Sequence, residues 1–335
     1  MLLLGGAPAR FAPARPPAGP AGTIGAVAAA VEVDHLHKRY GPLEAVVDVS
    51  FAVEEGEVFA LLGPNGAGKT TTLEILWGLR QRDGGSVRVL GHDPARHERA
   101  VRERVGVVLQ ELALEPMLTV REVLARNASF YPHPRPVDEV IELVGLSEKA
   151  DARVRSLSGG QQRRLDVGLG IVGDPELVFL DEPTTGFDPS ARRGAWELVR
   201  ALSGEGTTVI LTTHYMDEAE ALADRVGVIA AGRIVALSSP ATLGGRDTSE
   251  AHVRFRLPPG HDPSELPSLP VPVRRLAGGV LELASNDEVH LLHVLTGWAE
   301  ATATPLLGLT VERMTLEDVY LRLTTDPAPA DRSAR

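Results

Sequence analysis

Residues 63–70 constrain the fold of this chain more than any other stretch. They read Gly-Pro-Asn-Gly-Ala-Gly-Lys-Thr, a strict Gly-x-x-x-x-Gly-Lys-Thr pattern. The apolar run 57–62 before it predicts a buried parallel strand, and 70–79 after it predicts a helix whose apolar period runs from Leu73 to Leu79. In this context backbone N–H groups can surround a phosphate at the positive end of a helix. We therefore predict a phosphate site and disfavour the alternative, a glycine-rich turn before an ordinary helix.

The loop pattern also predicts roles for individual residues. Lys69 is expected to reach the β- and γ-phosphates of a nucleotide, and the Thr70 hydroxyl is expected to bind Mg²⁺. Because the glycines keep side chains away from the phosphates, the backbone of the whole loop is expected to contact the nucleotide. The predicted nucleotide-binding residues of the loop are Gly63, Pro64, Asn65, Gly66, Ala67, Gly68, Lys69, Thr70 and Thr71.

The composition of the chain limits the classes of protein to which it can belong. A length of 335 residues allows two domains. A net charge of −11 argues against a protein that binds nucleic acid through nonspecific electrostatic attraction. The absence of cysteine excludes a disulfide framework and a thiolate metal site. The longest apolar run, 24–31, is far shorter than the roughly 20 residues of a membrane span. Residues 1–30 are rich in Ala, Pro and Gly and predict a disordered tail or an over-long start, not a signal peptide.

From residue 31 onward, the apolar pattern predicts an α/β fold with a P-loop core. Apolar strands alternate with helical segments, which gives a parallel sheet sandwiched by helices. Alternating strands ahead of the loop predict an antiparallel β subdomain, and the helical region 111–157 predicts a helical subdomain. The predicted strands are 31–36, 45–53, 57–62, 86–90, 105–109, 177–180, 208–211 and the hairpin 226–229 with 233–236, and the predicted helices are 70–79, 120–130, 137–144, 161–172 and 190–202.

A domain boundary is expected near the glycine pair at 244–245. We divide the chain into a tail at 1–30, a nucleotide-binding domain at 31–245 and a small α+β accessory domain at 246–335. In the accessory domain, Ser285 and Glu288 have the spacing of a capping box that would begin a helix. No group of residues in this last domain suggests chemistry of its own.

Polar residues follow several predicted strands at their carboxyl ends. Asp181 and Glu182 end the strand 177–180, which we expect to lie beside the P-loop strand. Asp181 would bind Mg²⁺, because a hard cation prefers carboxylate oxygen, and Glu182 could polarise the water that attacks the γ-phosphate. Gln110 could contact Mg²⁺ and that water, and His214 could contact the γ-phosphate or Glu182. In isolation, Gln110 and His214 would be ordinary polar loop residues, but their places at successive strand ends favour the site.

Residues 157–161 read Leu-Ser-Gly-Gly-Gln and begin a predicted helix. They therefore form a second helix N-terminus that can bind an anion. One chain cannot easily direct both helix ends at one γ-phosphate, whereas two chains placed head to tail can. We expect Ser158 and Gly160 of one chain to face Lys69 of the other.

With this pentapeptide and the P-loop in one chain, the sequence resembles the ATP-binding subunits of ABC transporters over about residues 31–244. The resemblance implies that ATP and Mg²⁺ are bound, that Tyr40 stacks on adenine, and that Glu182 is the catalytic base. Phe187 departs from the family pattern, in which Leu is more common. The implied catalytic residues are Glu182, His214, Gln110 and Lys69, the implied metal ligands are Thr70, Gln110 and Asp181, and the implied contacts from the second chain are Ser158, Gly159, Gly160, Gln161 and Asp188.

Two further stretches narrow the resemblance. Residues 213–220 and 315–321 are similar to those of daunorubicin-resistance-type exporters, whose membrane spans lie in separate permease proteins. Because every motif is intact in one chain, we expect a homodimer with two active sites, and the resemblance implies that it lies at the cytoplasmic face of the cell membrane. It would power export of a drug-like or other hydrophobic substrate through a multi-span permease that docks around 117–120. The ATPase of an uptake system shares every catalytic motif and stays an alternative, and so does a non-transport ABC ATPase that acts on ribosomes or DNA.

Overall fold

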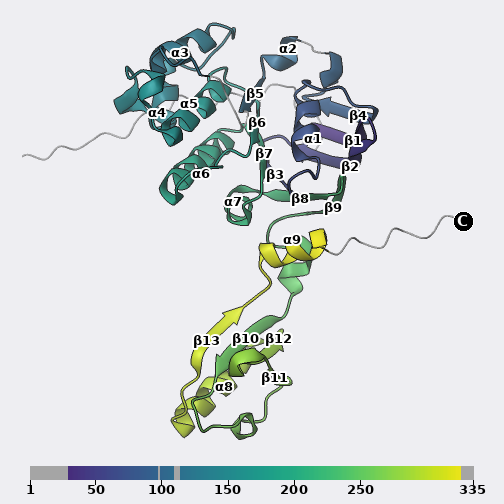
Figure 1. Cartoon of the computed structure of the whole chain (residues 1–335), viewed down its shortest axis with the longest axis vertical. Coiled ribbons are helices and arrows are strands. Elements are labelled where there is room, and N and C mark those ends of the chain that lie inside the picture. Colours follow the sequence, from purple (N-terminus) through teal and green to yellow (C-terminus); the bar gives the residue numbers. More distant parts are fainter. Residues whose placement is uncertain (1–28, 97–98, 109–113, 326–335) are drawn as a thin grey trace, which may run out of the picture.

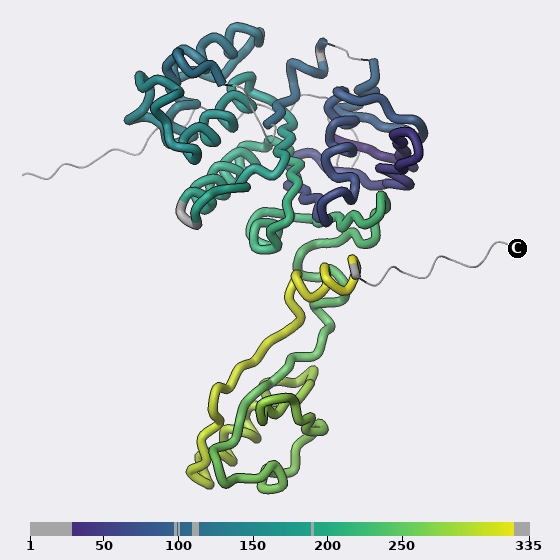
Figure 2. Tube along the Cα trace, in the orientation of Figure 1, coloured from purple at the N-terminus to yellow at the C-terminus, as the bar shows by residue number. Residues whose placement is uncertain are grey.

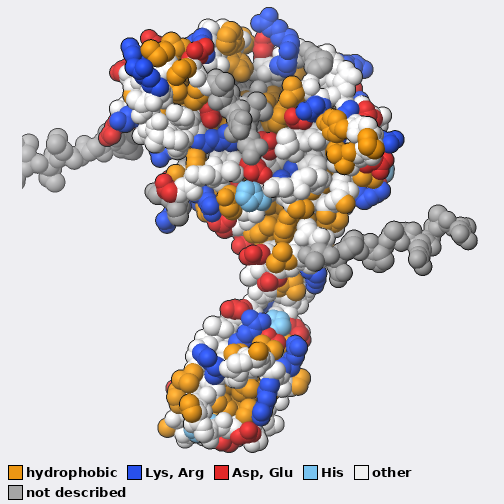
Figure 3. Space-filling model, in the orientation of Figure 1, with side chains coloured by type: hydrophobic (Ala, Val, Ile, Leu, Met, Phe, Trp, Pro, Cys, Tyr) orange, Lys and Arg blue, Asp and Glu red, His pale blue; other side chains and the backbone are white. Residues whose placement is uncertain are grey.

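The computed structural model describes residues 29–96, 99–108 and 114–325, which form two parts joined by a narrow connection (Figure 1). The larger part contains a nine-stranded sheet, and the smaller part extends from it as an arm built on a four-stranded sheet (Figure 2). On the face drawn in Figure 3, acidic and basic side chains are interspersed over both parts. Within the described ranges, no helix has the length and apolar character needed to cross a membrane. The predicted tail lies outside the described residues except for Ala29 and Ala30, which belong to the first strand.

The strands of the larger sheet are β1 (Ala29–Tyr40), β2 (Leu43–Glu54), β3 (Val58–Leu62), β4 (Gly84–Val89), β5 (Val105–Val108), β6 (Leu177–Asp181), β7 (Thr208–Thr213), β8 (Arg225–Ala230) and β9 (Arg233–Ser238). Their order is β4-β1-β2-β9-β8-β3-β7-β6-β5. Strands β5, β6, β7, β3 and β8 are parallel, whereas β1 pairs antiparallel with β2 and β4, and β8 pairs antiparallel with β9. The predicted α/β fold, its antiparallel strands and its final hairpin are confirmed.

Parallel pairing brings the ends of the central strands to one edge of the sheet. Leu62 at the end of β3 pairs with Thr213 of β7, and Asp181 at the end of β6 pairs with Thr212. The prediction that β6 lies beside the P-loop strand is wrong, because β7 lies between β3 and β6. Both β6 and β7 are fully buried, so their local apolar pattern could not distinguish which one pairs with β3.

Side chains of the central strands alternate between two hydrophobic cores, one on each face of the sheet. Leu61 packs with β1, β2 and α1 (Lys69–Leu76), whereas Leu62 packs into the core on the opposite face. This second core is covered by α3 (Val120–Ala128), α4 (Val137–Leu143), α5 (Gly159–Ile171), α6 (Pro189–Gly204) and α7 (Met216–Leu222). Burial on both faces explains the continuous apolar sequence of the central strands. Leu79 was expected on the buried face of the first helix, but α1 ends at Leu76 and Leu79 is exposed.

The arm consists of β10 (Ala251–Arg256), β11 (Arg274–Arg275), β12 (Leu281–Ser285), β13 (Leu307–Glu312) and α8 (Glu288–Thr302), with the strand order β11-β12-β10-β13. Its core joins Phe255 and Leu283 of the sheet to Leu291 of the helix. The predicted capping box is wrong, because Asp287 caps α8 by accepting a hydrogen bond from the His290 N–H at 3.0 Å. The Ser285 hydroxyl instead accepts from the Asp287 N–H at 3.0 Å, one step earlier in the turn.

The last helix of the described residues, α9 (Leu316–Thr325), follows the arm in sequence but packs against α7 and β8 of the larger part. Leu316 and Val319 are fully buried in the same core as the helices of that part. Arg322 donates a hydrogen bond to the carbonyl oxygen of Gly244 at 3.0 Å. The chain therefore leaves the larger part to form the arm and then returns to it.

Candidate nucleotide-binding site

Close packing or backbone conformation favours glycine at three positions of the loop between β3 and α1. Gly66 and Gly68 have φ angles of +80° and +105°, which residues with a Cβ rarely adopt. A Cβ atom on Gly63 would lie 2.5 Å from the carbonyl oxygen of Ile229, and one on Gly68 would lie 2.5 Å from that of Ala45. The loop therefore lies closely against β2 and β8, and glycine at these positions is required by the fold.

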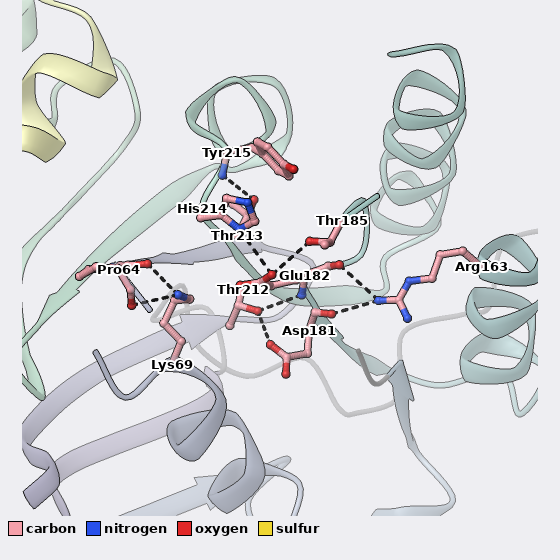
Figure 4. A network of polar contacts seen from close by, with 11 residues as sticks. Pro64, Lys69, Arg163, Asp181, Glu182, Thr185, Thr212, Thr213, His214 and Tyr215 are labelled. Carbon is pink, nitrogen blue, oxygen red and sulfur yellow. Dashed lines mark hydrogen bonds and ion pairs between the residues drawn. The ribbon is translucent and has the colours of Figure 1, made fainter. Parts of the chain in front are cut away.

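Lys69 begins α1, and its side chain is only 5% exposed. Its Nζ donates hydrogen bonds to the carbonyl oxygens of Gly63 at 2.7 Å and Pro64 at 3.3 Å (Figure 4). Burial lowers the pKa of Lys69, and the negative charges of Glu182 and Asp181 act in the opposite direction. A cation held inside the loop beside these carboxylates is suited to bind phosphate oxygens. Of the neighbouring hydroxyl residues, Thr70 is exposed and available to a ligand.

Thr212 of β7 joins the two acidic residues at the end of β6. Its hydroxyl donates a hydrogen bond to Asp181 Oδ1 at 2.5 Å and accepts one from the Glu182 N–H at 3.0 Å. Asp181 is buried, so this contact fixes the orientation of its carboxylate. Glu182 has a φ of +48°, a left-handed conformation that costs a residue with a Cβ about 1–2 kcal/mol. Such strain gathers at functional sites. The role of Thr212 was missed from the sequence, where its only signal was its place in an apolar strand.

His214 follows β7, and the structure brings it to Glu182. Its Nδ1 lies 3.4 Å from Glu182 Oε2, and Thr185 Oγ1 donates a hydrogen bond to the same oxygen at 3.1 Å (Figure 4). The Glu182 side chain is 14% exposed, and these polar partners offset part of its desolvation. A carboxylate held in this way beside an imidazole is suited to accept a proton from water.

Arg163 of α5 was not singled out from the sequence, but it contacts the same strand end. Its buried guanidinium donates hydrogen bonds to the carbonyl oxygens of Asp181 at 3.0 Å, Glu182 at 3.3 Å and Pro183 at 3.2 Å. Burial lowers the pKa of Arg163, and the carboxylate of Asp166, 3.8 Å away, acts in the opposite direction. This one side chain therefore holds the backbone that carries both carboxylates.

The Leu-Ser-Gly-Gly-Gln stretch begins α5 with a capping box. Ser158 Oγ accepts a hydrogen bond from the Gln161 N–H at 3.3 Å, and Gln161 Oε1 accepts one from the Ser158 N–H at 2.9 Å. Across the described part of the chain, no hydrogen bond or ion pair links 158–161 to the loop 63–71. Within one chain, the two predicted anion-binding helix ends are therefore not in direct contact.

Asp188 lies beside this second helix end. Its Oδ1 accepts a hydrogen bond from the Ala191 N–H at 2.9 Å, and α6 begins directly after it. A Cβ atom on Gly160 would lie 3.9 Å from the Cβ of Ala191. The residues predicted to act on a second chain, Ser158, Gly159, Gly160, Gln161 and Asp188, are thus gathered at two neighbouring helix starts.

Of the two remaining predicted residues, Tyr40 lies within the described ranges and Gln110 does not. Tyr40 ends β1 and is 37% exposed, and the cationic groups of Lys38 and Arg80 each lie 5.4 Å from the centre of its ring. An exposed aromatic ring of this kind can stack on a base. Gln110, predicted to contact Mg²⁺ and the attacking water, lies outside the described residues.

The donor set fits Mg²⁺. The Thr70 hydroxyl and the Asp181 carboxylate are hard oxygen ligands of the kind that this cation prefers. Among the residues that the structure describes, no group of three or more His, Cys, Asp or Glu side chains forms a complete metal cage. Mg²⁺ usually binds through one or two carboxylates together with water and substrate phosphates, so a sparse set of protein ligands is what it requires.

A tight P-loop, a buried carboxylate and a glutamate paired with histidine, all at the ends of parallel strands, define a P-loop nucleoside triphosphatase. A family model described as ABC transporter matches residues 46–185, and a second, described as ABC transporter domain-containing protein-like, C-terminal domain, matches residues 251–315. A Nod factor export ATP-binding protein I of Ralstonia nicotianae is 40% identical over 306 residues, which cover 88% of this chain and 93% of that protein.

A second relative and a solved structure agree with these matches. A daunorubicin resistance ATP-binding protein of Streptomyces coeruleorubidus is 37% identical over 313 residues, which cover 89% of this chain and 96% of that protein. A solved ATP-binding subunit of an ABC transporter is 26% identical with a TM-score of 0.58, and the match covers 63% of this chain and 90% of that one. The chain belongs to the ATP-binding proteins of the ABC transporter family, and it is an ATPase.

Proposed function

We propose that this chain is the ATP-hydrolysing subunit of an ABC exporter and that it acts as a homodimer with two ATP molecules between its subunits. The pairing of Glu182 with His214 beside the buried Lys69 supports the proposal most directly. These groups offer a general base and a phosphate-binding cation at one edge of the sheet. Tyr40 would stack on the adenine, and the backbone of the loop 63–71 would bind the phosphates.

Hydrolysis would depend on two strand ends. Glu182 would accept a proton from the attacking water, while His214 would orient the Glu182 carboxylate and contact the γ-phosphate. Mg²⁺ would be held by Thr70, Asp181 and Gln110, and when bound it would neutralise charge on the phosphates. Since Thr212 bonds to both acidic residues, it would keep the base and the metal ligand in a fixed relation.

The second half of each site would come from the partner chain. Ser158, Gly160 and Asp188 lie at two adjacent helix starts, whose N–H groups favour an anion. Among the described residues, no hydrogen bond or ion pair joins Ser158 or Gly160 to the P-loop of their own chain. Placed head to tail, two chains would each supply this half to the other.

Export is proposed from the names of the relatives. One relative is named for Nod factor export and another for daunorubicin resistance. We propose that the dimer lies at the cytoplasmic face of the cell membrane and drives a separate multi-span permease docked around 117–120, where Met117 is 55% exposed. A drug-like or other hydrophobic compound is the proposed substrate class. The division of the chain at residue 245 into a nucleotide-binding domain and an accessory domain stays a prediction. Helix α9 follows residue 245 in sequence, but its buried residues belong to the core of the nucleotide-binding part.

Mixing two inactive variants tests the shared site. Lys69→Ala inactivates the P-loop half and Ser158→Arg inactivates the partner half, so each variant alone should lose nearly all turnover. Random mixing makes half of the dimers mixed, and each mixed dimer holds one intact site of two, so about a quarter of the wild-type rate should return.

The matched control mixes Lys69→Ala with Asp181→Asn. Both substitutions lie in the same half of the site, so no dimer of this mixture contains an intact site. Native mass spectrometry would establish that mixed dimers form in both experiments. Recovery in the control, or its absence in the test mixture once mixed dimers are present, would overturn the shared site.

A further inference from the structure

Tyr215 contacts both the proposed switch residue and a neighbouring helix. Its ring centre lies 4.1 Å from that of His214, with a tilt of 38° between the rings (Figure 4). The guanidinium carbon of Arg192 lies 4.2 Å from the centre of the Tyr215 ring. The backbone of Tyr215 is held as well, since its N–H donates a hydrogen bond to Thr213 Oγ1 at 3.0 Å. The ring is therefore fixed from its own backbone and from α6.

Arg192 connects this ring to the helix start that carries Asp188. The Arg192 N–H donates a hydrogen bond to the carbonyl oxygen of Asp188 at 3.0 Å, in the first turn of α6. Its Nη1 donates to Asp217 Oδ2 at 2.9 Å, and the side chain is 21% exposed. A guanidinium held by a carboxylate and stacked on an aromatic ring is a rigid contact. A continuous path of contacts thus leads from Asp188 to Arg192, Tyr215 and His214.

His214 itself has few restraints. Its side chain is 39% exposed, and its contact with Glu182 is 3.4 Å long, beyond the length of a strong hydrogen bond. An imidazole with this freedom could turn away from the carboxylate unless its ring were packed. Tyr215 supplies that packing through its ring. Its hydroxyl has no hydrogen bond to any part of the chain that is described, so the ring and not the hydroxyl makes the contact.

We propose that Tyr215 is a positioning residue for His214, and that Arg192 ties this position to the helix start at Asp188. The inference rests on the proposed role of His214 in hydrolysis. Because Asp188 would lie against the partner chain, dimer formation would be relayed to the imidazole through Arg192 and Tyr215. Neither residue touches the nucleotide in this scheme, so both act through His214 alone.

Substitutions at Tyr215 distinguish a role in positioning His214 from a role in binding ATP. Tyr215→Ala should lower kcat on the order of tenfold, since a misplaced catalytic group costs rate, while KM for ATP changes less than about twofold. Tyr215→Phe keeps the ring and should restore kcat to within about twofold of wild type. Phe130→Ala removes an aromatic ring that is 67% exposed and serves as the matched control. Loss of kcat in Tyr215→Phe, or a rise in KM equal to the loss of kcat in Tyr215→Ala, would overturn the proposal.

A double-mutant cycle tests the path through His214. If Tyr215 acts only through His214, adding Tyr215→Ala to His214→Ala should cause no further loss of kcat. Arg192→Ala should lower kcat when it is introduced into the wild-type protein. It should cause no further loss when it is added to His214→Ala. Additive losses would show that Tyr215 acts elsewhere, for example on folding, which thermal unfolding would reveal. Full turnover by His214→Ala would instead refute the proposed function of the site, so the two failures are distinguishable.

Discussion

Arg163 Nη2 donates a hydrogen bond to the carbonyl oxygen of Asp181 across 3.0 Å, and this bond joins α5, the helix that Ser158 caps, to the strand end that carries the proposed base. Arg163→Met should therefore lower turnover more than ATP affinity. It should also lower the free energy of unfolding by about 3–5 kcal/mol, because it leaves the buried Asp166 without its cation. Steady-state kinetics and urea unfolding would measure the two effects.

The neighbouring arginine is a matched control for this prediction. Arg164 makes a longer contact, 3.5 Å from its Nη1 to the carbonyl oxygen of Gly145. Arg164→Met should leave turnover within about twofold of wild type. Equal losses in the two variants would indicate that charge on α5, and not the bond to the strand end, matters.

Glu182→Gln should retain ATP binding and lose turnover by about 10²–10⁴-fold, the usual contribution of a general base. Glutamine keeps the shape of the side chain, so the contact with Thr185 can persist. With ATP bound and not hydrolysed, the variant should accumulate as a dimer in size-exclusion chromatography. Glu197→Gln, on the exposed face of α6, is the control. Undiminished hydrolysis by Glu182→Gln would exclude this residue as the base.

Tyr40→Ala should weaken ATP binding without lowering kcat. Stacking of a base on an aromatic ring contributes about 1–3 kcal/mol, so the Kd for ATP should rise about 5- to 150-fold. Because every base has a π face, the Kd for GTP should rise by a similar factor. Tyr40→Phe retains the ring and should bind like wild type. An unchanged Kd in Tyr40→Ala would place the adenine elsewhere.

The parts of the site that lie next to one another in sequence were predictable, and the parts that depend on packing were not. The spacing of Gly63, Gly68 and Lys69 predicts the loop because adjacent backbone groups alone determine its shape. The order β3-β7-β6 depends on which of several similarly apolar strands pair with one another. The strand that ends in Asp181 was therefore predicted to lie beside the P-loop strand, whereas β7 lies between them.

Single polar residues inside apolar segments were the hardest to interpret. Thr212 reads as a β-branched strand residue, and only its pairing with Asp181 shows that its hydroxyl bonds to the Asp181 carboxylate and to the Glu182 N–H. Arg163 is one of two adjacent arginines, and only the packing of α5 decides which of them turns inward. Ser285 and Asp287 are both good capping residues, and the extent of β12 decides between them.

Asp166 should make stability depend on pH. Burial raises its pKa from 3.8 to about 6, against the opposing charge of Arg163. The folded protein therefore holds this proton more tightly than the unfolded chain, and the resulting stability is present below pH 3.8 and lost as the pH rises through about 6. Asp166→Asn should flatten the pH dependence of the unfolding free energy in this window by up to about 3 kcal/mol. Exposed Asp247→Asn is the control, and identical slopes for the two variants in urea titrations would contradict the assignment.

Helix α9 should stabilise the nucleotide-binding part although it follows the arm in sequence. Leu316 is 1% exposed in the core of that part. Leu316→Ala should therefore lower the free energy of unfolding by about 2–5 kcal/mol, because burial is lost and a cavity is left behind. Calorimetry of the full chain can identify the relevant transition, because ATP should raise the Tm of the part that binds it. Leu316→Ala should lower that ATP-sensitive transition. Leu321→Ala, on the same helix and 51% exposed, should change the free energy of unfolding of that part by less than about 0.5 kcal/mol. If Leu316→Ala shifts only a transition that ATP does not affect, α9 belongs energetically to the arm.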